Sequence, residues 1–79
     1  MSANAVAANI YPNPTNGILN ITLAPDDQLR QWRLMNAQGQ LLRQGNSLQL
    51  DLADFPGGVY LLELQTRRGT QRMRVVRAL

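Results

Sequence analysis

Apolar and polar residues alternate with a period of two over most of the chain, which is the pattern of strands that bury one face. The clearest run extends over residues 48–64. Its expected buried positions are Leu48, Leu50, Leu52, Tyr60, Leu62 and Leu64. Pro56 interrupts the run, since it cannot donate to a ladder, and Gly57 and Gly58 allow the positive φ of a sharp corner. The run predicts two strands and a stiff corner at the centre of the core.

The rest of the chain carries shorter segments of the same kind. Strands are expected over residues 18–24, 29–35, 40–44, 47–52 and 70–79. Asn36 to Gly39 predicts a hairpin with Gly39 in a left-handed position, and Arg67-Arg68-Gly69 predicts another of the same kind. No stretch has helical periodicity. The pattern predicts an all-β, immunoglobulin-like antiparallel β-sandwich of about seven short strands.

Two prolines mark the beginning of the ordered part. Residues 1–9 are small and polar, and we interpret them as a tether, with the domain proper over residues 10–79. Pro12 and Pro14 push the residues before them toward extended geometry and should keep this stretch from pairing. Asn16-Gly17 is therefore expected to form an open corner and not a tight hairpin.

Composition narrows the function classes. Seventy-nine residues make one small domain, and the chain has neither Cys nor His. This excludes disulfides, thiolate metal sites and the usual general base, so we expect no enzyme, no metal site and no cofactor. Asp26-Asp27 and the pair Asp51 and Asp54 are interpreted as turn residues, since a calcium site needs six or more oxygens.

Charge is distributed unevenly along the chain. Residues 1–66 carry three arginines against five acidic residues, whereas residues 67–79 carry five arginines and no acid. Such an end either meets an acidic partner or discourages pairing at the sheet edge. It contains no aromatic residue, so nucleic-acid binding is not expected. No apolar run is long enough to predict a transmembrane segment.

Trp32 permits a second interpretation of the chain. A lone Trp in a strand pattern is most simply a core anchor. If Trp32 and Tyr60 were instead accessible, they would form a sugar-stacking platform. The chain would then be a β-sandwich accessory module, carbohydrate-binding or structural, of a larger secreted protein.

Four segments in order resemble a known family. These segments are Ile10-Tyr11-Pro12-Asn13-Pro14-Thr15-Asn16-Gly17, Leu34 to Leu42, Leu50 to Leu62, and Arg72-Met73-Arg74-Val75-Val76-Arg77. Together they resemble the type A C-terminal sorting domain of the type IX (Por) secretion system, over nearly the whole chain. The family's terminal segment is usually rich in lysine, whereas every basic residue here is arginine.

The resemblance implies a fold, a route and partners. Members are immunoglobulin-like sandwiches of Bacteroidota, carried behind an N-terminally fused cargo that reaches the periplasm. The outer-membrane translocon recognises the domain, and a sortase-like peptidase commonly removes it, in the tether, as cargo is secreted or attached to the cell surface. The positions that the resemblance assigns to partner recognition are Pro12, Asn13, Pro14, Gly39, Gly58, Tyr60, Arg72, Arg74, Val75, Val76, Arg77 and Leu79.

Overall fold

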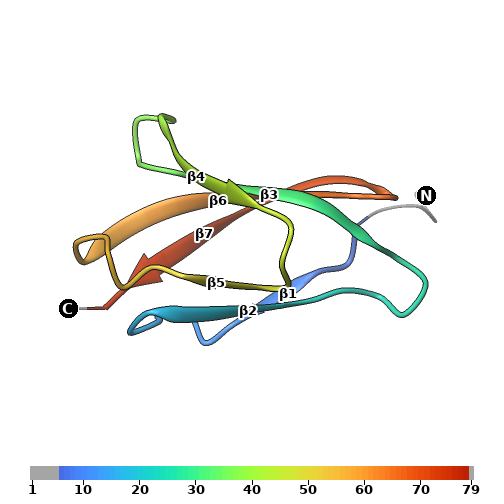
Figure 1. Ribbon diagram of the computed structural model, residues 1–79, viewed down its shortest axis with the longest axis horizontal. Coiled ribbons are helices and arrows are strands. Elements are labelled where there is room, and N and C mark those ends of the chain that lie inside the picture. The colour runs from blue at the N-terminus through green and yellow to red at the C-terminus, as the bar shows by residue number, and fades with distance from the viewer. Residues whose placement is uncertain (1–5, 79) are drawn as a thin grey trace.

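The computed structural model describes residues 6–78, which form seven strands in two antiparallel sheets and no helix (Figure 1). One sheet has the order β1-β2-β5, with bounds Asn9–Tyr11, Ile18–Thr22 and Gln49–Asp51. The other has the order β4-β3-β6-β7, with bounds Leu41–Gly45, Leu29–Met35, Gly58–Thr66 and Gly69–Arg77. This confirms the predicted all-β sandwich. The fourth strand pairs with the third, which places it at an edge.

The core between the sheets follows the predicted alternation. Leu50, Leu52, Tyr60, Leu62 and Leu64 are all buried, as are Trp32 and Leu34 of β3. Leu48, which was expected beside Leu50, is instead 52% exposed. Its strand begins only at Gln49, so the alternation does not yet hold at residue 48.

The two hairpins of the larger sheet differ in kind. Gly39 has φ 83°, and its amide donates to the carbonyl oxygen of Asn36 at 2.9 Å, which confirms the left-handed position. The second hairpin has a two-residue loop, Arg67 and Arg68, because Gly69 already pairs with Thr66 in the ladder. The prediction of two hairpins of the same kind is therefore wrong for the second. The full-length β6–β7 register leaves no residue for a longer loop.

The beginning of the chain pairs with both sheets. β1 pairs with β2 through Ile10 and Ile21, and farther on Thr15 forms a parallel bridge with Arg77 of β7. The peptide bonds before Pro12 and Pro14 are cis. The expectation that the prolines keep this stretch from pairing is wrong. Residues 9–11, before the prolines, pair with β2, and Thr15, after them, pairs with β7. Six residues separate β1 from β2, so the connection is the open corner that was expected.

The segment before β1 also contacts the sandwich. Ala8 is buried, and Val6 packs against the core. Residues 1–5 of the proposed tether lie outside the described residues. The described part of the chain contains no helix with the length and hydrophobicity needed to cross a bilayer.

Candidate functional site

The segments that carry most of the positions assigned to recognition gather at one end of the sandwich, which we call the C-terminal end (Figure 1), whereas Arg72 lies farther along β7, opposite Glu63. It comprises the corner 12–17, the hairpin tip 36–40, the corner 53–57 and the end of β7. The strand registers bring these segments together, since Gly58 pairs with Arg77 and Met35 pairs with Leu61. Leu79 lies outside the described residues.

Asn13 and Thr15 cover the edge of β7 at this end. The Asn13 side chain donates to the carbonyl oxygen of Arg74 and accepts from the amide of Val76, both at 2.9 Å. The Thr15 backbone donates to Val76 at 2.9 Å and accepts from Ala78 at 2.8 Å. These four bonds reproduce the contacts of a neighbouring strand. Asn13 is thus a clamp on β7, although its side chain remains exposed at the surface.

Thr15 is held in place from the other side. It is 1% exposed, and its hydroxyl donates to the carbonyl oxygen of Ile18 and accepts from the amide of Gly17. A buried hydroxyl must be paired, and these two bonds satisfy it. The corner between β1 and β2 is thereby fixed, and with it the two backbone bonds to β7.

Three of the assigned residues are explained by core packing or by backbone conformation. Tyr60 is buried, its hydroxyl donates to the carbonyl oxygen of Pro56, and its ring lies 6.0 Å from that of Phe55. Val75 is fully buried opposite Tyr60. Gly58 has φ 152°, and a Cβ there would meet no atom within 4 Å, so the residue serves backbone conformation and not close packing.

The other face of the four-stranded sheet points away from the core, and we call it the outer face. Cross-strand partners lie on the same face of a sheet, so the registers define rows across the strands. One row consists of Leu41, Met35, Leu61 and Arg74, and beside it Val59 pairs with Val76. Leu41 and Val59 are 52% and 47% exposed. The outer face therefore carries an apolar patch at the C-terminal end, with Arg74 on its border.

A second row on the outer face is charged. It consists of Gln44, Arg33, Glu63 and Arg72. Glu63 accepts from Gln65 at 2.9 Å and from the Arg72 guanidinium at 3.0 Å. These bonds hold the pKa of the buried Glu63 carboxyl below its usual 4.5, more strongly than burial raises it. Glu63 thus remains ionised and ties β7 to β6.

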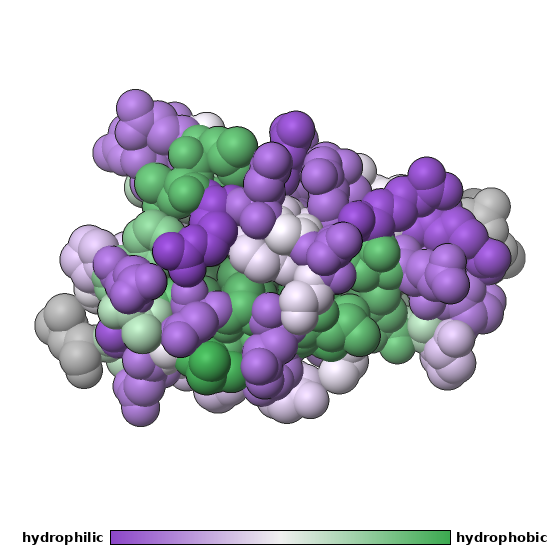
Figure 2. All heavy atoms as spheres, viewed as in Figure 1, coloured by the Kyte–Doolittle hydropathy of each residue, from purple (hydrophilic) through white to green (hydrophobic). Residues whose placement is uncertain are grey.

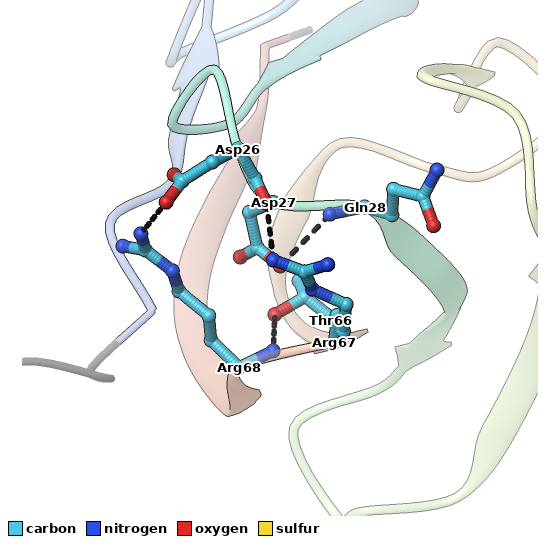
Figure 3. Close-up of polar contacts among 6 residues, drawn as sticks. All are labelled: Asp26, Asp27, Gln28, Thr66, Arg67 and Arg68. Atoms are coloured by element: carbon cyan, nitrogen blue, oxygen red, sulfur yellow. Dashed lines mark hydrogen bonds and ion pairs between the residues drawn. The ribbon is translucent and has the colours of Figure 1, made fainter.

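The basic stretch 67–79 does not form a single patch, because β7 runs the length of the sandwich. At the end opposite the assigned positions, Arg67 donates to the carbonyl oxygen of Asp26 and Arg68 pairs with its carboxylate (Figure 3). At the other end Arg77 donates to the carbonyl oxygen of Leu52 at 3.1 Å. The ion pairs among the described residues involve Arg43, Arg68 and Arg72. Arg74 is exposed and belongs to none of them.

Asp27 stabilises the same loop from inside. Burial raises the pKa of its carboxyl, but the nearby Thr66 side chain, the Gln28 amide that donates to the carboxylate, and the neighbouring Arg68 outweigh burial and hold the pKa below its usual 3.8. The bond from the Gln28 amide is 2.8 Å long (Figure 3). Asp26 and Asp27 lie in the β2–β3 turn, as expected, and Asp26 also joins this loop to the β6–β7 turn. Asp51, which was also expected in a turn, is instead the last residue of β5, because its backbone pairs with Ile18.

The aromatic platform of the accessory-module hypothesis is not present on the surface. Trp32 is 4% exposed, and its indole N–H donates to the carbonyl oxygen of Ser47 at 2.9 Å. Tyr60 is 6% exposed. The two side chains on which that hypothesis depended therefore pack in the core and offer no ring face to a sugar.

Sequence reasoning missed the apolar members of the outer face. The alternation of β3 and β6 predicts polar residues on the outer face, and three apolar residues stand there instead, namely Met35, Val59 and Leu61. Each is an exception that the sequence alone displays. Their assembly into one patch depends on the register between strands, and a single strand's pattern does not contain it.

Comparison with known proteins gives one match. The family described as secretion system C-terminal sorting domain matches residues 9–77. No curated protein and no solved structure matches the chain. The match covers all seven strands and both ends of the sandwich.

Proposed function

The chain belongs to the family of secretion system C-terminal sorting domains, and from this we propose that it directs a protein fused to its N-terminus across the outer membrane. The family is one of signals for type IX secretion and not of catalysts. Proteins that carry such a domain are secreted or reach the cell surface. The observation that carries the proposal is the match over residues 9–77, which spans every strand.

The partners follow from the same proposal. The outer-membrane translocon of the type IX system would bind the C-terminal end of the domain, where the assigned positions gather. Arg74 and Val76 lie on the outer face there, and exposed charge beside apolar surface suits specific recognition. In this proposal Asn13 acts indirectly, since it fixes the β7 backbone next to both side chains.

A sortase-like peptidase would then release the domain from its cargo. We place the cleavage in residues 1–9, with the carrier passing through the periplasm before export. Ala8 is buried and Asn9 lies in β1, so a cut before Val6 leaves the sandwich intact. The cargo would be set free or attached to the cell surface.

A fusion tests this proposal directly. A fluorescent reporter with a periplasmic signal at its N-terminus and residues 1–79 at its C-terminus is expressed in a bacterium that has a type IX system. We expect the reporter outside the outer membrane in the parent strain and in the periplasm of a translocon-deficient strain. Retention in the parent strain, with the domain shown to be folded, would contradict the proposal.

A further inference from the structure

The two edges of the four-stranded sheet differ in how far they are covered. At one edge, Asn13 and Thr15 occupy the backbone of β7 from Arg74 to Ala78. At the other edge β4 pairs with β3 alone among the described strands, and residues 41–44 are all exposed. An uncovered edge strand is a template for pairing with another chain. β4 is therefore the edge of this sheet at which a partner strand finds room.

The ladder shows which backbone groups β4 presents. Val76 turns both its amide and its carbonyl away from β6, toward Asn13 and Thr15. Along an antiparallel ladder, the backbone amide and carbonyl groups of successive residues point to alternate sides of the strand. When the registers are followed from Val76 through β6 and β3 to β4, the backbone groups of Arg43 point toward β3 and those of Gln44 point away from it. The amide and carbonyl of Gln44 thus face the open edge.

The side chains of β4 give this edge its chemical character. Leu41 and Leu42 are 52% and 37% exposed, and Leu41 continues the outer-face row of Met35 and Leu61. Figure 2 shows apolar surface over β4, next to the polar hairpin tip. Arg43 lies on the opposite face of the strand, with its guanidinium 4.8 Å from the centre of the Phe55 ring. The edge combines apolar surface with an arginine that is 40% exposed, and Arg43 forms an ion pair of 3.5 Å with the 82% exposed carboxylate of Asp54.

We propose that β4 accepts an extended segment of a partner protein as a fifth strand of this sheet. The partner strand has apolar residues next to Leu41 and an acidic residue next to Arg43, which shares or replaces the exposed Asp54 as the partner of its guanidinium. Main-chain bonds to Gln44 give such a strand its affinity, and the side chains select it. A second copy of this chain fits less well, because its own β4, with the sequence Leu-Leu-Arg-Gln-Gly, contains no acidic residue to pair with Arg43. The inference rests on the proposed function, in which the partner strand belongs to the export machinery.

A peptide titration tests the edge without any export. The probe is a short capped peptide of alternating valine and glutamate, followed by NMR of the folded 79-residue domain. We expect saturable shifts at Leu42 and Gln44 and none along β7. A peptide of alternating valine and lysine should bind roughly tenfold more weakly. Shifts confined to β7, or no saturable shift in β4, would overturn the inference.

Two variants make the test specific. Gln44→Pro removes the outward amide but no bond to β3, and proline is tolerated on an edge strand, so the domain should fold and lose the peptide. Gln44→Ala is the matched control and should bind as the parent does. Arg43→Glu should reverse the preference, so that the lysine peptide binds better than the glutamate peptide. If Arg43→Glu still preferred the glutamate peptide, the proposed contact of Arg43 with an acidic residue would be overturned, even if Gln44→Pro did not fold.

The reporter fusion separates this inference from the proposed function. If the parent is exported and Gln44→Pro is retained while Gln44→Ala passes, both stand. If the glutamate peptide binds β4 but the parent fusion stays in the periplasm, strand addition at β4 stands and the proposed sorting role is contradicted. If Gln44→Pro is exported as well as Gln44→Ala, the strand addition fails and the sorting role remains. Concentration-dependent dimers that Gln44→Pro abolishes would assign the edge to a second copy and overturn the proposed partner.

Discussion

At the scale of single residues, two contacts join segments of the sandwich that are not neighbours in the sequence. The Asn13 side chain forms two hydrogen bonds with the β7 backbone, to residues 61 and 63 positions later in the sequence. Gly45 lies against the indole ring of Trp32. Neither contact has a signal in the local sequence, because each joins segments that are distant along the chain or on neighbouring strands. Each can be removed by one substitution.

The Asn13 clamp predicts a local effect as well as a global one. Asn13→Ala loses two exposed hydrogen bonds and should lower the free energy of unfolding by about 1–2 kcal/mol. Hydrogen exchange by NMR should show faster exchange of the Val76 amide, with the Ala78 amide still protected by Thr15. Asn13→Asp keeps an acceptor for Val76, so its Val76 amide should stay protected. Unchanged exchange at Val76 in Asn13→Ala would contradict the clamp.

Gly45 predicts a steric effect. A Cβ at this position would lie 2.7 Å from the Cζ2 atom of Trp32, so the indole ring must move. Gly45→Ala should cost about 1–3 kcal/mol of stability in urea unfolding, the usual range for overpacking a core. Gln44→Ala, one position earlier and exposed, should stay within about 0.5 kcal/mol of the parent. Equal stability of the two variants would show that Trp32 is not held against β4.

At the scale of elements, the charged row and the neighbouring pair Gln31 and Gln65 join β3, β6 and β7 on the outer face. Gln31 donates to Gln65, Gln65 donates to Glu63, and Glu63 accepts from Arg72. Glu63 is buried and remains charged because both partners lower its pKa. Its ionisation is therefore linked to the stability of the sheet.

The sign of this linkage is fixed by the direction of the shift. The folded-state pKa of Glu63 lies below its ordinary 4.5, so the stabilisation is present above pH 4.5 and is lost as the pH falls through the folded value. Urea unfolding from about pH 6 to about pH 3 should show less acid destabilisation in Glu63→Gln than in the parent. Identical pH profiles for the two proteins would contradict a shifted Glu63.

The elements also show what sequence patterns can predict. Strict alternation identified Tyr60, Leu62 and Leu64 as buried, because one face of β6 packs on the core along its whole length. It failed at Leu48, where no strand has yet formed. It could not predict the outer-face row from Leu41 to Arg74, because that row depends on the register of four strands. Register is set by turn lengths and by a bulge between Leu34 and Met35.

At the scale of the whole molecule, the recognition surface that we propose lies at the end of the sandwich farthest from the β6–β7 turn. Arg67 and Arg68 are used at that turn to bind Asp26, so the basic sequence stretch contributes only part of its charge to the outer face. Arg74 and Val76 remain on the surface beside the apolar patch. The account therefore holds that the domain is recognised as a folded face and not as a basic tail.

One measurement tests this claim most directly, namely export of the reporter fusion with Arg74→Glu compared with Arg30→Glu. The two variants change the net charge equally, and Arg30 is an exposed residue of β3 away from the C-terminal end. With both domains shown to be folded, Arg74→Glu should reduce export roughly tenfold, while Arg30→Glu should be exported as the parent is. Equal export of the two variants, or an equal loss in both, would contradict recognition through the outer face.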